Sequence, residues 1–337
     1  MNKCKCPSHS RPVVMALLLA VVLAAAGCQQ KAQREAQTAP IKLILAAQPA
    51  PYSGLIAVAD EKGFFKQAGV EVTLKLYTSG LESLNAMQAG EAQIATVADI
   101  AFAGKMNEDP SLRVVASIGL SVGNQIVARK DRNIREPADL KGKKIGFTPS
   151  TVSDYFLYSF LLTNHLSPND VTAVSIPAAR QAEAVVAGDV DAVSAFEIFA
   201  FAAKEQLGEN AVSWDTQNNL GYQWLLVTRE STTKSPEAIK RLLKALMMAE
   251  DFARTNEDET KDIISKKWGF SPVYIRQSWN QTILDVSFSQ SIIASLKNYA
   301  KWKMERDGKT GDPPDVLNFL YTDALDEIDP RVVTIFR

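Results

Sequence analysis

AMQAGEAQIATVADI, at residues 86–100, recurs in altered form as AVVAGDVDAVSAFEI at residues 184–198. Both copies hold an Ala-Gly pair and then an acidic residue, at a constant offset of 98 residues. Nine residues after each glycine a second acid follows an apolar strand, Asp99 in one copy and Glu197 in the other. The repeat therefore predicts two lobes of similar construction, each with a carboxylate at the same strand end. The alternative is convergence on a common helix-glycine-strand pattern, in which Asp99 only caps the next helix.

Around the repeat, strand-like and helix-like segments alternate from residue 41 onward, which is typical of an α/β fold. The first set of predicted strands is IKLILAA (41–47), VEVTLKLY (70–77) and QIATV (93–97). The second set is KKIGF (143–147), VTAVSIP (171–177) and VDAVSAF (190–196). From Ser235 the pattern changes to long amphipathic helices, with Pro236 at a first helical position. Ligand positions are expected at the carboxyl ends of the strands.

The N-terminal sequence has the pattern of a targeting signal. Basic residues precede the apolar stretch 13–26, which is too short to span a bilayer comfortably. The stretch ends in LAAAGC and so resembles a bacterial lipoprotein signal in which Cys28 is lipidated and becomes the mature N-terminus. No other cysteine follows Cys28, which favours an acylated thiol over a disulfide. The alternative is an ordinary secretory signal cut near Ala26. Residues 28–40 are expected to form a polar tether.

Composition and charge exclude some classes of protein. The chain has 337 residues, 46% of them hydrophobic, which is enough for one large or two medium domains. A formal net charge of −1 argues against a nucleic-acid partner. No stretch after the N-terminal signal has the roughly 18 uninterrupted apolar residues of a membrane span.

Taken together, these blocks resemble the periplasmic solute-binding proteins of ABC importers, in the group that serves nitrate, sulfonates, taurine and thiamine-precursor pyrimidines. The resemblance rests on ADEKGFFKQAGVEVTL (59–74), the region 79–102, ADLKGKKIGF (138–147), AGDVDAVSAFE (187–197) and the C-terminal NYAKWKMERDG (298–308) and IDPRVV (328–333). It implies a two-lobed α/β periplasmic-binding-protein fold of type II, with two hinge strands and a helical C-terminal segment.

The same resemblance implies where the lobes begin and end. The hinge strands are expected near 123–129 and 221–228. Lobe 1 is expected to hold residues 41–125 and 226–337, and lobe 2 residues 126–225. In many relatives the second-lobe block reads Trp-Glu-Pro, whereas this chain has Phe196-Glu197-Ile198. That departure leaves the ligand open and the architecture unaffected.

The candidate binding residues combine hydroxyls at helix starts with the two acids. In KKIGFTPSTVSDYFLYSFL (143–161) a hydroxyl-rich turn lies between a strand and a helix, where unpaired N–H groups suit an anion. The alternative is that Thr151 and Asp154 form a capping box with no ligand role. The predicted ligand-binding residues are Tyr52, Ser79, Gly80, Asp99, Asn124, Ser150, Thr151, Ser153, Glu197 and Trp224.

Hydroxyl donors at one end and Asp99 with Glu197 at the other would suit a zwitterion such as taurine. A neutral heterocycle that donates hydrogen bonds to the carboxylates is the alternative, with rings such as Tyr155 or Phe196 stacked on it. In a further alternative, Glu197 lies on a solvated helix start. No cofactor and no metal site are predicted. The expected partners are a small-molecule ligand, the permease and ATPase of an ABC importer, and a membrane reached through the lipid anchor. The chain is expected to act as a monomer.

Two other functions compete with transport. An enzyme is disfavoured because the sequence lacks H-E-x-x-H, C-x-x-C and phosphate-loop motifs, and His165 is the one histidine after the signal. A ligand-sensing module for a separate signalling partner is the second competitor. Exported binding and delivery to a permease remain the function that the resemblance implies.

Overall fold

The computed structural model describes Met1 and residues 40–216 and 220–336. The predicted signal peptide (1–27), the lipidated Cys28 and all but the last residue of the tether therefore lie outside the described residues. The fold described below belongs to the compact unit of residues 42–337, with the first strand beginning at Ile41.

Six strands form the first sheet, in the order β11-β4-β10-β3-β1-β2. Their bounds are β1 Ile41–Ala47, β2 Val70–Leu76, β3 Ile94–Ala98, β4 Leu112–Ser121, β10 Tyr222–Arg229 and β11 Thr282–Ile283. β1 runs parallel to β3, whereas β10 lies antiparallel between β3 and β4. β3 (IATVA) is buried along its whole length, as expected for an apolar strand at the centre of a sheet covered on both faces.

Five strands form the second sheet, in the order β7-β6-β8-β5-β9. Their bounds are β5 Gln125–Arg129, β6 Lys144–Phe147, β7 Thr172–Ser175, β8 Ala192–Ala195 and β9 Ala211–Asp215. Alternate residues of β5 enter opposite core layers, because Ile126 packs in one apolar cluster and Val127 in the other. A small third sheet pairs β12 (Phe288–Ser289) with β13 (Val333–Thr334).

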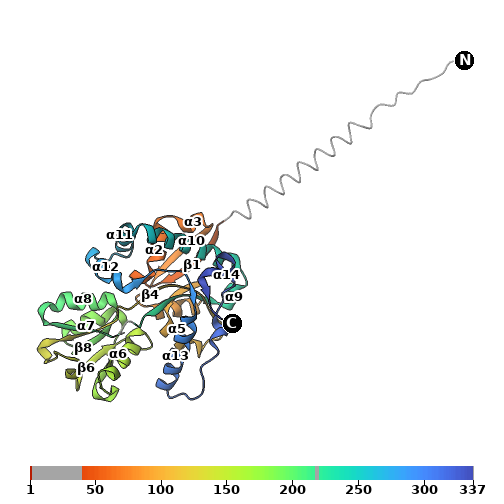
Figure 1. Cartoon of the computed structure of the whole chain (residues 1–337). Coiled ribbons are helices and arrows are strands. Elements are labelled where there is room, and N and C mark those ends of the chain that lie inside the picture. The colour runs from red at the N-terminus through yellow and green to blue at the C-terminus, as the bar shows by residue number, and fades with distance from the viewer. Residues whose placement is uncertain (2–39, 217–219, 337) are drawn as a thin grey trace. The chain divides into compact units, whose positions relative to one another are not determined.

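The helices cover these sheets and include a long C-terminal set (Figure 1). Those of the N-terminal part are α2 Gly54–Glu61, α3 Phe64–Gln67, α4 Gly80–Gln88 and α5 Asp99–Met106. Those around the second sheet are α6 Val152–Thr163, α7 Gln181–Ala187 and α8 Glu197–Leu207. The C-terminal set is α9 Glu230–Thr233, α10 Pro236–Thr255, α11 Glu257–Trp268, α12 Pro272–Ser278, α13 Gln290–Arg306 and α14 Asp323–Ile328. Pro236 does open α10, although the Ser235 side chain makes no cap hydrogen bond there.

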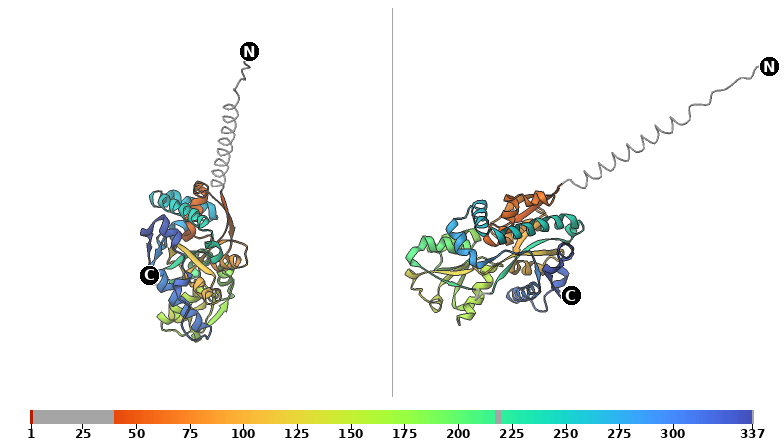
Figure 2. Two further views of the ribbon diagram at one scale, coloured as in Figure 1. Left: turned by 90° about the vertical axis from the view of Figure 1, so that its right-hand side faces the viewer. Right: turned by 45° about the horizontal axis from the view of Figure 1, so that its top comes forward.

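The chain passes between the two sheets twice. It leaves the first sheet after β4 and enters the second at β5, and it returns between β9 and β10. In the right-hand view of Figure 2 the yellow-green segment of the second sheet lies apart, while the orange and the teal-to-blue segments lie together. The predicted lobe boundaries, 41–125 with 226–337 and 126–225, remain a prediction.

The two copies of the sequence repeat adopt the same local structure. In the first copy β3 ends at Ala98 and Asp99 begins α5, and in the second β8 ends at Ala195 and Glu197 begins α8. Each acid thus occupies the first helical position after a central buried strand. The sequence pattern corresponds to equivalent positions in two separate sheets.

Candidate functional site

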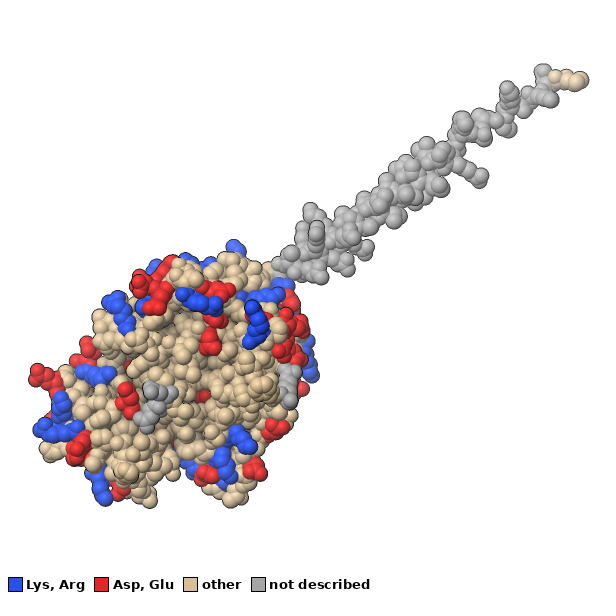
Figure 3. Space-filling model, viewed as in Figure 1, with Lys and Arg blue, Asp and Glu red and all other residues tan. Residues whose placement is uncertain are grey.

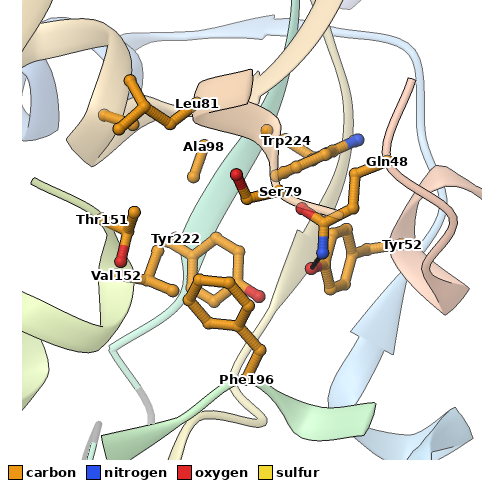
Figure 4. Close-up of a pocket in the computed structure, with 12 residues that line it drawn as sticks. Gln48, Tyr52, Ser79, Leu81, Ala98, Thr151, Val152, Phe196, Tyr222 and Trp224 are labelled. Atoms are coloured by element: carbon orange, nitrogen blue, oxygen red, sulfur yellow. Dashed lines mark hydrogen bonds between the residues drawn. The ribbon is translucent and has the colours of Figure 1, made fainter. Parts of the chain in front are cut away.

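A cavity lies where elements of the two sheets meet, and we call it the cleft cavity. It holds about 280 Å³ of empty space, including its open mouth. The lining residues are Gln48, Tyr52, Ser79, Gly80, Leu81, Ala98, Ala101, Thr151, Val152, Phe196, Tyr222 and Trp224. None of these side chains carries a full charge. Figure 4 shows the rings of Tyr222 and Phe196 between Thr151 and Val152 on one side and Gln48 and Tyr52 on the other.

Four helices begin at this cavity. Ser79, Ala98, Thr151 and Phe196 all line it, and they are the N-cap residues of α4, α5, α6 and α8. The N–H groups of a first helical turn have no partner within the helix and carry partial positive charge. Their convergence on an uncharged cavity favours the binding of an anion.

The hydroxyl groups of Thr151 and Ser79, at two of these helix starts, differ in how many hydrogen bonds they already make within the protein. Thr151 Oγ1 donates to the Thr148 carbonyl at 2.7 Å and accepts the Ser153 N–H at 3.2 Å, so its hydrogen-bonding capacity is largely spent. Ser79 Oγ accepts the Glu82 N–H at 3.2 Å as an N-cap. Because that bond uses only a lone pair, the Ser79 O–H remains a donor that a ligand can accept from.

Aromatic rings form one wall of the cleft cavity. Tyr52 packs edge-on against Trp224, with ring centroids 4.7 Å apart, and against Tyr222 at 5.6 Å. Trp224 is only 2% exposed, and its Nε1 has no hydrogen-bond partner among the described residues. Buried donors are nearly always paired, so this N–H marks a place where an acceptor is missing. The wall offers apolar area to the organic part of a ligand.

The turn that carries Tyr52 is held by its own hydrogen bonds. Ser53 Oγ donates to the Gln48 carbonyl at 2.8 Å and accepts the Ala50 N–H at 3.0 Å. Gln48 Nε2 donates to Tyr52 Oη at 3.5 Å, the contact drawn in Figure 4. Burial, with a smaller effect of Glu197, raises the pKa of Tyr52 well above its usual value, so the phenol stays a neutral donor.

Glu197 stands behind the cleft cavity and does not line it. The hydroxyls of Ser121 and Tyr222 both donate to its Oε1, the latter at 2.7 Å. Burial raises the pKa of Glu197, and these two hydroxyl bonds partly offset the rise. The carboxylate thus orients Tyr222, whose ring forms part of the cavity wall.

Asp99 is fully buried at the start of α5 and does not line the cleft cavity either. Its Oδ1 accepts the Ile100 N–H at 2.8 Å, whereas Oδ2 has no hydrogen-bond partner within the described residues. Burial raises the pKa of Asp99 to about 7, against the smaller opposing effects of the Gln223 backbone and the Ser295 hydroxyl. Asp99 and Glu197 therefore do not form the facing pair of carboxylates in this cavity that the sequence predicted, because neither of them lines it.

Half of the predicted binding residues line the cleft cavity: Tyr52, Ser79, Gly80, Thr151 and Trp224. The other five lie beside it and bond internally. The Asn124 amide donates to the Ser194 and Thr216 hydroxyls. The Ser150 N–H donates to Asp154 Oδ2 at 3.0 Å. Ser153 Oγ donates to the Ser194 carbonyl at 2.7 Å, which holds α6 against the second sheet.

The sequence reasoning missed Tyr222 and Gln48 as lining residues. Tyr222 could have been found, since it lies two residues before Trp224 and side chains two apart on a strand share a face. Gln48 stands in the turn before Tyr52, but nothing in its local pattern distinguishes it. Within the described residues, no group of three or more His, Cys, Asp or Glu side chains is placed to hold a metal ion.

A family model described as NMT1/THI5 like matches residues 50–260, which is more than half of the chain. The chain belongs to this family. The taurine-binding periplasmic protein of Escherichia coli (strain K12) is 23% identical over 225 residues, which cover 66% of this chain and 69% of that protein. The predicted family is confirmed.

Solved structures are similar over most of this NMT1/THI5-like chain. The alkanesulfonate-binding protein SsuA from Xanthomonas axonopodis pv. citri, bound to MOPS, superposes with a TM-score of 0.72 at 17% identity, covering 84% of this chain and 99% of that one. The desulfurization enzyme DSZB gives a TM-score of 0.62 at 20% identity, covering 86% of this chain and 99% of that one. At these identities the likeness concerns the fold, and it confirms the predicted two-lobed α/β periplasmic-binding-protein fold.

Proposed function

We propose that this chain is an exported solute-binding protein that captures an organic sulfonate in the cleft cavity and delivers it to the permease of an ABC importer. The observation that carries the proposal is the convergence of four helix N-termini on a cavity with no charged lining residue. A sulfonate has three acceptor oxygens and one charge. It fits backbone N–H groups and the Ser79 hydroxyl without needing a basic side chain.

The rest of the cavity fits a carbon skeleton better than an amine. Tyr52, Phe196 and Tyr222 present rings, and Leu81 and Val152 present apolar groups. Taurine would bring an ammonium group that meets no ionised side chain in the lining. A buried charge without a partner costs several kcal/mol. We therefore infer an alkane- or arylsulfonate in place of the zwitterion that the two acids first indicated.

Calorimetric titration with a ligand panel tests this inference. Hexanesulfonate is expected to bind at least about tenfold more tightly than taurine, because its chain is buried against the rings and brings no second charge. Nitrate and a thiamine-precursor pyrimidine serve as competitors in the same panel. Binding of the pyrimidine without any sulfonate would replace the proposal.

That pyrimidine is the second candidate ligand, and one observation favours it. The ring wall, together with the Gln48 amide, is a typical surface for stacking and hydrogen-bonding a planar heterocycle. Against it, the four helix starts supply donors only, whereas a pyrimidine amine needs acceptors. The sulfonate uses more of the groups that are present.

Replacing Ser79 by glycine is expected to weaken hexanesulfonate binding roughly tenfold, or about 1.5 kcal/mol, the low end for a hydrogen bond to a charged group. Glycine keeps most of the N-cap stability, so the loss reports the hydroxyl. Ser271, the N-cap of α12, accepts the Val273 and Tyr274 N–H groups and does not line the cleft cavity. Ser271→Gly is the matched control and should leave affinity unchanged. Equal affinity of both variants would exclude Ser79 as a ligand contact.

Delivery to a permease and lipidation at Cys28 belong to the same proposal. The family and the fold support the transport role. None of the helices in residues 40–216 and 220–336 has the length and apolar character needed to cross a bilayer.

Metabolic labelling with a fatty acid tests the anchor, and the label is expected to be lost in Cys28→Ser. Uptake of labelled hexanesulfonate by cells that carry or lack the gene tests transport, and uptake independent of the gene would favour a sensor.

We also propose that the protein changes no bond in its ligand, although an enzyme is among its structural neighbours. The sequence has no cysteine after Cys28, and its exposed His165 does not line the cleft cavity. A bound sulfonate should therefore be recovered unchanged after prolonged incubation, as measured by mass spectrometry. Release of sulfite would contradict this reading.

A further inference from the structure

A second cavity lies on the other side of Glu197, and we call it the hinge cavity because Gly123, in the segment between the two sheets, lines it. It holds about 470 Å³ of empty space, including its opening. One wall is α8, and the opposite wall is α12 with the residues that follow it. The rings of Phe201 on α8 and Tyr274 on α12 pack at 5.3 Å and join the two walls.

The acidic end of the hinge cavity brings two acceptors together. A Cβ added to Gly123 would lie 3.0 Å from Glu197 Oε1 and 3.1 Å from Gln281 Oε1. The same Cβ would collide with Glu197 Cγ, so glycine is the residue that lets the Glu197 side chain pack here with Gln281 Oε1 nearby. A carboxylate beside an amide oxygen suits an ammonium group, which has three donors and no acceptor.

The basic end is formed by Lys204, on the same helix as Glu197. The two residues are seven apart, so they lie on the same face of α8 with about 10 Å of axial separation. Lys204 Nζ donates to Gln125 Oε1 at 2.7 Å, and burial lowers the pKa of Lys204 while Asp215 and Glu205 oppose that change. The acid group of a ligand bound here would form an ion pair with the Lys204 ammonium.

We propose that the hinge cavity binds a small zwitterion, an ω-amino acid, with its ammonium group at Glu197 and Gln281 and its acid group at Lys204. The spacing along α8 selects a chain of several carbons between the two charges, because an α-amino acid is too short to reach both. Figure 3 shows basic and acidic side chains intermixed around one face of the molecule. The site is separate from the cleft cavity. Its proposed ligand carries one positive and one negative charge, whereas the ligand proposed for the cleft cavity carries a single negative charge.

The two cavities share one hydrogen bond. Tyr222 lines the cleft cavity and its hydroxyl donates to Glu197, which lines the hinge cavity. An ammonium at Glu197 competes for the carboxylate and so alters how firmly the Tyr222 ring is held. Occupation of one cavity is therefore expected to change affinity at the other by the same factor in both directions. This coupling rests on the proposed sulfonate site, whereas the hinge site itself does not.

Calorimetric titration of the full chain with δ-aminovalerate tests the hinge site without any sulfonate. We expect saturable binding that weakens at least tenfold in Lys204→Gln. The matched control is Lys144→Gln, at an exposed lysine that begins β6, and it should bind as the wild type does. Valerate and pentylamine, each with one charge, should bind at least tenfold more weakly. Gln281→Leu provides a second variant should Lys204→Gln melt early.

Two results would overturn the hinge site. One is the absence of saturable δ-aminovalerate binding at millimolar concentration. The other is wild-type affinity in both folded variants, which would place the zwitterion elsewhere. The coupling is tested by repeating the titration at saturating hexanesulfonate, where equal factors in the two directions are required. Failure of hexanesulfonate to bind would remove the proposed function and leave the first titration intact.

Discussion

Replacing Gly80 by alanine is expected to weaken hexanesulfonate binding about a hundredfold, or roughly 2.7 kcal/mol. A Cβ at this position would lie 2.6 Å from Trp224 Cη2 and 3.0 Å from Val97 Cα. Neither neighbour can yield easily, since one is backbone and the other is a buried ring packed on Tyr52. Overpacking of this kind forces side chains and backbone to move, at a cost of about 1–3 kcal/mol. The movement falls on the start of α4 and on the ring wall, the two features that bind the ligand.

The chain offers a matched control within α5. A Cβ at Gly104 would meet Lys303 Cγ at 3.6 Å, which is an ordinary contact. Gly104→Ala should therefore leave binding unchanged and raise the melting temperature, because alanine is favoured over glycine inside a helix by about 1 kcal/mol. Wild-type affinity in a folded Gly80→Ala protein would show that the ligand binds outside the cleft cavity.

The α/β order and the position of the helix starts could be predicted because they depend on local patterns. The strand-like run 143–147, the hydroxyl turn and the aromatic helix gave β6 and α6 as expected, and Thr151 is an N-cap, as the alternative interpretation proposed. The repeat predicted that Asp99 and Glu197 follow a strand end, and both residues begin a helix there. Such features follow from residues within a few positions of one another.

The direction in which those side chains turn could not be predicted, because it is set by residues far along the chain. Glu197 is turned by Ser121, which lies 76 residues before it, and by Tyr222. Ser153 is held away from the cleft cavity by the carbonyl of Ser194, 41 residues later. A hydroxyl or carboxylate at a strand end is thus predictable as a position, but its hydrogen-bond partner belongs to the tertiary structure.

Replacing Asp99 by asparagine is expected to remove a pH dependence of stability worth up to about 4 kcal/mol. The pKa of the folded carboxyl is about 7, chiefly because of burial, against an ordinary value of 3.8. Between these two values the folded protein holds a proton that the unfolded chain releases. The contribution of Asp99 is therefore fully present below about pH 4 and is lost as the pH rises toward 7. Asparagine keeps an oxygen for the Ile100 N–H and has no proton to lose.

Urea unfolding at a series of pH values from about 4 to 8 measures this effect as the difference in the free energy of unfolding between wild type and variant. The difference cancels the titration of other acids, such as Asp154 and Glu250, whose pKa values burial also raises. Asp312→Asn, at an exposed position, is the control and should give a difference that does not vary with pH. The wild type should lose stability relative to Asp99→Asn as the pH rises. A constant difference would contradict the prediction, because it would mean that Asp99 ionises in the folded protein at no cost despite its complete burial and its unpaired Oδ2.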